Sequence, residues 1–80
     1  MAKNYDEVDY IIRTKVAEVL VECRKEKGLT QAELAKEISS NPTTVATWEQ
    51  AKSMPSIQML YRLAKYYDKS IGYMYGEADK

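Results

Sequence analysis

The stretch Gly28-Leu29-Thr30-Gln31-Ala32-Glu33-Leu34-Ala35-Lys36-Glu37-Ile38 decides the fold of this chain. Thr30 is followed three residues later by Glu33, a capping-box pattern which predicts that a short helix begins here. Asn41 and Pro42 come shortly afterwards, and a cap followed by proline predicts the start of a second helix. Because so short a turn cannot fold two helices antiparallel, they must cross at a steep angle.

Two short helices crossing in this way form a helix-turn-helix, which presents its second helix to the major groove of DNA. Apolar residues at helical spacing on both sides predict three further helices. One runs from Lys3 to Lys27 and buries Val8, Ile12, Val16, Val19, Leu20 and Cys23. The other two begin at Ser56 and Ser70 and bury Ile57, Leu60, Leu63, Ala64, Tyr67, Ile71 and Met74. The sequence therefore predicts an all-α, compact five-helix domain.

Length and composition restrict the functions that this chain can have. The 80 residues are enough for one domain, and they include one cysteine and no histidine. We therefore expect no disulfide, no metal, no cofactor and no enzyme, because no nucleophile–base pair or ligand set can be assembled. No membrane span or signal peptide is visible, which predicts a cytoplasmic protein. Since the formal net charge is zero, DNA binding requires charges segregated on one face.

The quoted stretch, followed by Trp48-Glu49, Lys52 and Pro55-Ser56, resembles the phage-repressor and Cro-like (xenobiotic-response-element type) helix-turn-helix family. The resemblance covers residues 12–76 and implies a lambda-repressor-like DNA-binding domain with a central helix-turn-helix. Residues 1–11 are then an N-terminal extension or extra turns of the first helix, and residues 77–80 a polar tail. The recognition helix, about 42–50, is expected to lie in the major groove.

The resemblance also implies roles for individual residues in contacting double-stranded DNA. It assigns base contacts to Pro42, Thr43 and Thr47. It assigns phosphate contacts to Gln31, Asn41, Thr44 and Lys52, and Gln50 is a further candidate, with Arg62 and Lys65 near it. Capping alone is the alternative role for Asn41 and Thr44. An acid on the recognition helix would repel phosphate, and the resemblance pairs Glu49 with Arg24 inside the fold. Trp48 is expected in the core.

The sequence departs from the family pattern in three ways. Ser39-Ser40 replaces the usual Gly and small apolar residue of the turn, and Ala51 replaces the usual glycine after the recognition helix. Both substitutions cost energy wherever φ is positive. The recognition helix has neither Arg nor Lys, so two threonines remain to offer a methyl group to thymine or one hydroxyl bond. This predicts modest affinity, A·T-tolerant readout and dependence on DNA shape or dimerisation.

The leading hypothesis is a sequence-specific DNA-binding transcriptional regulator, a repressor that acts as a homodimer and is prokaryotic or phage-encoded. Its dimer surface is either a second apolar stripe of Tyr10, Ile11 and Val21 or the tail residues Tyr73 and Tyr75. The alternative is a protein-interaction module of the same fold with little DNA affinity, such as an antirepressor-like partner. No small-molecule ligand is evident in the sequence.

Overall fold

Five helices make up the part of the chain that the computed structural model describes, residues 4–77. They are α1 (Tyr5–Glu26), α2 (Gln31–Glu37), α3 (Pro42–Glu49), α4 (Ile57–Tyr67) and α5 (Ile71–Met74). The all-α, five-helix prediction is confirmed. The predicted start of the first helix at Lys3 and most of the predicted polar tail lie outside the described residues. Residues 5–11 continue α1 without a break.

Each helix begins at a residue whose side-chain oxygen accepts a backbone N–H three positions further on, which satisfies one donor that the helix leaves unpaired. In α2 the capping box is complete, because Thr30 accepts from the Glu33 amide (3.1 Å) and Glu33 Oε1 accepts from the Thr30 amide (2.8 Å). The five caps are Asn4, Thr30, Asn41, Ser56 and Ser70. Local sequence therefore determines where every helix starts.

All five helices end at a residue with positive φ, yet only two of these residues are glycines. After α2, Ser39 has a φ of 59°, and after α3, Ala51 has a φ of 61°. Next to each, the following amide donates back to a carbonyl in the last turn: Ser40 N to Ala35 O and Lys52 N to Thr47 O. Both departures from glycine noted in the sequence therefore lie in the strained left-handed region.

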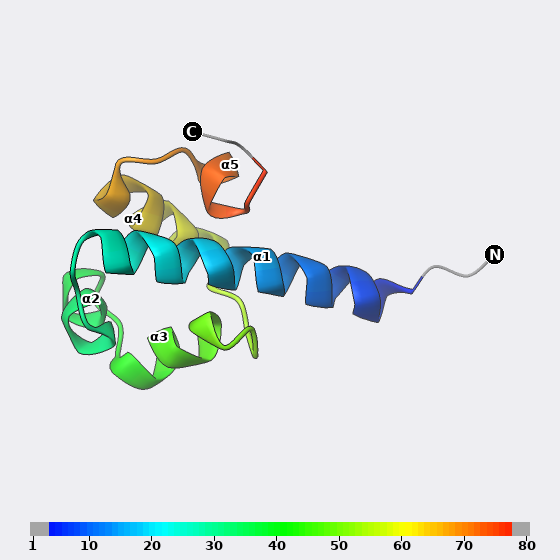
Figure 1. Cartoon of the computed structure of the whole chain (residues 1–80), viewed down its shortest axis with the longest axis horizontal. Helices are drawn as coiled ribbons and strands as arrows, with labels where there is room; N and C mark the ends of the chain where they lie inside the picture. The colour runs from blue at the N-terminus through cyan, green and yellow to red at the C-terminus, as the bar shows by residue number, and fades with distance from the viewer. Residues whose placement is uncertain (1–3, 78–80) are drawn as a thin grey trace.

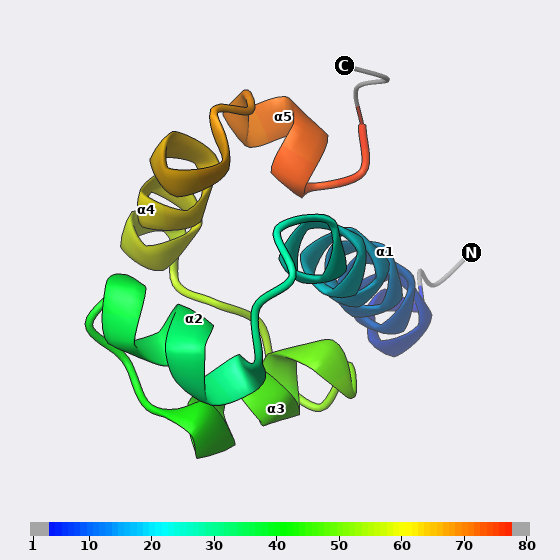
Figure 2. The same cartoon turned by 60° about the vertical axis from the view of Figure 1, so that its left-hand side comes forward.

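The core lies between α1 and the other four helices. Figure 2 shows α1 on one side of it, with α2 and α3 below and α4 and α5 completing the ring. Trp48 is buried, as predicted from its spacing, and Cys23 is 1% exposed. Burial raises the pKa of the Cys23 thiol, so the thiol packs as a protonated group. The buried cluster comprises Val16, Leu20, Cys23, Leu34, Ala35, Ile38, Val45, Trp48, Leu60, Leu63, Ala64, Tyr67 and Met74.

Two residues predicted to be buried are instead exposed: Val8 is 56% exposed and Ile57 is 52% exposed. Val8 lies in the N-terminal turns of α1, which project beyond the other helices (Figure 1). Ile57 is the first residue of α4, where Met54 and Pro55 from the preceding loop reach the core instead. In both places the apolar period of the helix continues past the elements that could cover it. Within residues 4–77, no helix is long and apolar enough to cross a membrane.

Replacing Ala51 by glycine should stabilise the fold by about 0.5–1 kcal/mol. Glycine adopts the left-handed conformation without strain, and this gain exceeds the entropy that glycine loses on folding. Urea unfolding of Ala51→Gly should show a higher midpoint at an unchanged slope. Ala46→Gly is the matched control inside α3, and it should destabilise by about 1 kcal/mol. A lower midpoint for Ala51→Gly than for the parent protein would contradict the assigned strain.

Candidate nucleic-acid interface

The turn between α2 and α3 sets the two helices at the angle that exposes one face of α3. Val45 and Trp48 of α3 are buried in the core, and they hold this helix against α1 and α2. The opposite face carries the three residues predicted to contact bases: Pro42 and Thr43 are exposed, and Thr47 is half-buried. Figure 2 shows α3 at the outer edge of the fold with α2 beside it.

A buried carboxylate joins α1, α2 and α3. Arg24 Nε donates to Glu49 Oε2 (2.7 Å) and Arg24 Nη2 donates to Glu49 Oε1 (2.9 Å), which forms a two-pronged ion pair. The side chains of Arg24 and Glu49 are 14% and 5% exposed. Arg24 Nη1 also donates to the Leu29 carbonyl (2.8 Å), so the same guanidinium holds the loop before α2. Glu49 therefore serves the fold, which is the role that the family resemblance implies for it.

Gln31 is the third member of this network. Its Nε2 donates to Glu49 Oε1 (3.0 Å), so one amide proton is used inside the fold. Burial by itself would raise the pKa of Glu49, but the hydrogen bonds from Arg24 and Gln31 outweigh it and hold the pKa below its usual range. The Gln31 amide is thereby oriented at the N-terminus of α2, where its second N–H remains free to donate to an acceptor outside the fold.

The side chains of Asn41 and Thr47 are also engaged within the fold. Asn41 Oδ1 accepts from the Thr44 amide (2.9 Å), so this residue caps α3. Thr47 Oγ1 donates to the Thr44 carbonyl (2.7 Å) and accepts from Ser53 Oγ (3.3 Å). The sequence did not single out Ser53. A hydroxyl that bonds back to the preceding turn is a common local pattern for threonine in helices.

Two arginines hold the loops around the candidate interface. Arg13 Nε donates to the Ala51 carbonyl (3.0 Å), which fixes the turn after α3 next to the exposed Gln50 and Lys52. Sequence reasoning missed Arg13, because nothing in its own helix indicates a partner 38 positions away. Arg62 Nη1 donates to the Ile38 carbonyl (3.1 Å) at the end of α2.

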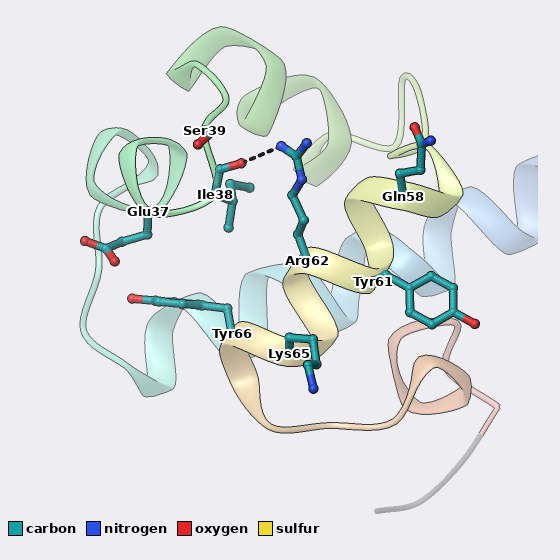
Figure 3. Close-up of a pocket in the computed structure, with 8 residues that line it drawn as sticks. All are labelled: Glu37, Ile38, Ser39, Gln58, Tyr61, Arg62, Lys65 and Tyr66. Atoms are coloured by element: carbon teal, nitrogen blue, oxygen red, sulfur yellow. Dashed lines mark hydrogen bonds between the residues drawn. The ribbon is translucent and has the colours of Figure 1, made fainter.

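Arg62 and Lys65 line a groove of about 620 Å³ between the end of α2 and α4. Figure 3 shows the Arg62 guanidinium pointing to the Ile38 carbonyl while Lys65 extends away from it. None of the residues lining this groove belongs to α3. The groove residues are Glu37, Ile38, Ser39, Gln58, Tyr61, Arg62, Lys65 and Tyr66. Within residues 4–77, no group of three or more His, Cys, Asp and Glu residues could hold a metal ion.

This arrangement of α2, turn and α3 defines a helix-turn-helix protein. The chain belongs to the HTH_3 helix-turn-helix family, which it matches over residues 20–74. It is similar to endothelial differentiation-related factor 1 of Homo sapiens, with 32% identity over 54 residues, 68% of this chain and 36% of that protein. It is also similar to multiprotein-bridging factor 1 of Debaryomyces hansenii, with 32% identity over 65 residues, 75% of this chain and 43% of that protein. The chain thus spans well under half the length of these curated relatives.

Solved structures share the fold. An HTH_3 family transcriptional regulator from Vibrio cholerae superposes with a TM-score of 0.75 at 22% identity, over 85% of this chain and 38% of that chain. Hydroxypropylphosphonic acid epoxidase from S. wedmorenis superposes with a TM-score of 0.71 at 31% identity, over 79% of this chain and 34% of that chain.

The similarity to an epoxidase corrects the expectation that the chain is not an enzyme. That expectation was wrong, because it treated the absence of catalytic groups in the fold as a general exclusion. The same fold forms about a third of a chain whose name is that of an enzyme. Function resides in sites added to a fold and not in the fold itself. The helix-turn-helix domain alone therefore does not decide between an enzyme and a non-enzyme.

Removing the Arg24 side chain should leave Glu49 as a buried, unpaired charge and cost about 3–5 kcal/mol of unfolding free energy. Arg24→Met should be measured against Lys65→Met, an exposed cation of α4 whose loss should cost under about 0.5 kcal/mol. The double variant Arg24→Met/Glu49→Gln should recover part of the loss, because no buried charge remains. Equal losses of unfolding free energy in Arg24→Met and Lys65→Met would contradict the structural role of the Arg24–Glu49 pair.

The same pair should make stability depend on pH. Because the folded-state pKa of Glu49 lies below its ordinary value near 4.5, its contribution is fully present above that pH and is lost as the pH falls through the folded-state pKa. In Arg24→Met the Glu49 carboxylate lacks its main partner, so protonation of Glu49 removes the unpaired buried charge and stabilises the folded variant. The difference in unfolding free energy between parent and Arg24→Met should therefore shrink as the pH falls. It shrinks first above pH 4.5, where the buried carboxylate of the variant takes up a proton, and then further as the pH falls through the lowered folded-state pKa of the parent. A constant difference between neutral and acidic pH would contradict this sign.

Proposed function

We propose that the chain is a sequence-specific DNA-binding transcriptional regulator, a repressor whose α3 enters the major groove. Membership of the helix-turn-helix family supports a DNA-binding regulator. The observation that carries the proposal is the Arg24–Glu49–Gln31 network. It fixes α2 and α3 to α1 and leaves the outer face of α3 exposed.

The proposal gives two sets of residues to DNA. Pro42, Thr43 and Thr47 meet base edges, because they share the outer face of α3. The phosphate contacts surround that face, from the start of α2 to the loop after α3. They are Gln31, Asn41, Thr44, Gln50 and Lys52. Asn41 caps α3 through its oxygen and keeps its amide protons for phosphate, so both proposed roles are compatible.

A protein-interaction module remains the second candidate. The names of the curated relatives favour it, because one of them is a multiprotein-bridging factor. A recognition helix with no Arg or Lys and a formal net charge of zero favour it as well. On this alternative the chain binds proteins through the same fold and has little affinity for DNA.

Binding to duplex DNA across a salt series separates the two candidates. Lys52→Ala should weaken binding on all sequences and lower the salt slope by about 1, because one phosphate contact is lost. Lys36→Ala is the matched control, an exposed lysine of α2 outside the proposed contacts, and it should leave the slope unchanged. Absence of salt-dependent binding by the parent protein would remove the DNA proposal and leave the interaction module.

We further propose that the regulator is a homodimer which pairs through the N-terminal half of α1, and that it acts in the cytoplasm. Tyr10 and Ile11 are 59% and 49% exposed. Tyr10 and Val21, two of the three residues of the predicted stripe, also line a groove of about 430 Å³ between α1 and α3. Tyr73 and Tyr75 of the alternative surface are half-buried and pack against the core, so they offer less area to a partner.

Charge on the projecting half of α1 favours an antiparallel pair. Asp6, Glu7 and Asp9 lie at its start, whereas the exposed Lys15 lies further along. Antiparallel helices related by a two-fold axis would bring unlike charges together, and a parallel pair would bring like charges together. The apolar residues between these charges would then be shared by both copies.

Ile11→Ser with Tyr10→Ser should shift the protein toward the monomer in sedimentation-velocity experiments over a concentration series. The physical reason is the loss of apolar area that only the dimer would bury. Tyr61→Ser is the matched control, because Tyr61 is equally exposed but lies on α4. A parent protein that stays monomeric at every concentration, with and without DNA, would contradict the homodimer.

A further inference from the structure

The outer face of α3 has an unusual chemical composition for a DNA-reading surface. Of the eight residues of the helix, Val45 and Trp48 are buried, and Glu49 is held by Arg24 and Gln31. The face that remains therefore consists of proline, alanine and threonines. It carries no charge and no amide group within the helix. Its members are Pro42, Thr43, Thr44, Ala46 and Thr47.

Hydrogen bonds within the fold reduce the polarity of this face further. Pro42 has no N–H to donate. The Thr47 hydroxyl gives its proton to the Thr44 carbonyl at 2.7 Å and accepts one from Ser53 at 3.3 Å. A hydroxyl has one donor, so Thr47 has none left for a base without breaking this bond. What Thr47 can still offer to a base edge is one acceptor lone pair and its methyl group, but no proton.

The hydroxyls of Thr43 and Thr44 are therefore the side-chain donors that this face can offer, and it can recognise few polar features in the major groove. Guanine, adenine and cytosine present acceptors or donors there, and thymine alone adds a C5-methyl group. Covering a polar base edge without a partner costs free energy, whereas covering a methyl group gains it. We propose that α3 reads thymine through its C5-methyl group, with Pro42, Ala46 and Thr47 as the apolar contacts. This inference rests on the proposed DNA-binding function and names what that site recognises.

Gln50 is the polar residue that could compete with this mode of reading. It follows α3 as its C-cap, is exposed, and has an amide that could pair with adenine N6 and N7. Both modes favour A·T pairs, so a preference for A·T alone does not distinguish them. Removing the thymine methyl group does, because adenine keeps all its hydrogen-bonding groups.

The experiment first selects the duplex that the protein prefers at low salt, and then replaces each thymine singly by deoxyuridine. Uracil lacks only the C5-methyl group, and each methyl read by α3 should account for about a fourfold loss of affinity, the factor that corresponds to about 0.8 kcal/mol. Deoxyuridine outside the bound site should have no effect. Replacing cytosine by 5-methylcytosine in a poorly bound C·G variant of a read position should recover part of the affinity.

Two substitutions at one position test whether Thr47 makes the contact. Thr47→Ser keeps the hydroxyl and removes the methyl group, so it should lose discrimination between thymine and uracil at one position. Thr47→Val keeps the methyl and removes the hydroxyl, so it should retain that discrimination. The thymine-to-uracil series uses the unaltered protein, and therefore it does not depend on how either variant folds.

The outcomes separate this inference from the function on which it rests. Salt-dependent binding with equal affinity for thymine and uracil duplexes would overturn methyl readout and leave the DNA-binding function intact. Discrimination that survives Thr47→Ser unchanged would overturn the role of Thr47. Failure to bind any duplex at low salt would overturn the proposed function, and methyl readout with it.

Discussion

The buried carboxylate of Glu49 is the constraint on which the rest of the structure depends. It lies at the last residue of α3, is 5% exposed in its side chain, and accepts three hydrogen bonds from Arg24 and Gln31. Those donors come from the last turns of α1 and the first residue of α2, so a single carboxylate connects three helices. Because burying a charge is costly unless it is fully paired, α3 cannot rotate or slide without losing this compensation. The charge thus fixes the orientation in which the outer face of α3 is presented.

The same interaction bears on how α3, the proposed recognition helix, would meet DNA. Glu49 is the single charged residue of α3, and its charge is balanced inside the protein and not at the surface. The outer face therefore neither attracts nor repels phosphate strongly. On the proposed function, attraction to phosphate has to come from the residues around this face, where Lys52 is exposed and Gln31 is oriented by Glu49. Burial of Glu49 therefore produces both the structural ion pair with Arg24 and the uncharged outer face of α3.

Sequence reasoning succeeded where the cause is local and failed where it is distant. The caps Thr30, Asn41, Ser56 and Ser70 were predicted, because a cap depends on a residue and on the three that follow it. Burial of Val8 and Ile57 was predicted wrongly, because the apolar period of a helix does not indicate where its neighbours end. The contacts of Gln31 with Glu49 and of Arg13 with Ala51 were not predicted, because they join residues 18 and 38 positions apart. The implied pairing of Arg24 with Glu49 came from resemblance and not from the pattern of the chain.

These limits also bear on function. The fold alone is shared with a transcriptional regulator and with an epoxidase, so it leaves the activity open. What bears on function in this chain is the chemistry of α3. It has an uncharged face of proline, alanine and threonines, one carboxylate paired inside the fold, and a Thr47 hydroxyl whose proton is donated to the backbone. A net charge of zero gives little long-range attraction to DNA, so non-specific binding should be weak. When the sequence-independent part of the affinity is small, each apolar contact to a base accounts for a larger share of the total. An uncharged interface of this kind should therefore bind DNA more weakly but select its sequence more strictly. Pairing two copies would raise the affinity for DNA without adding charge to the interface.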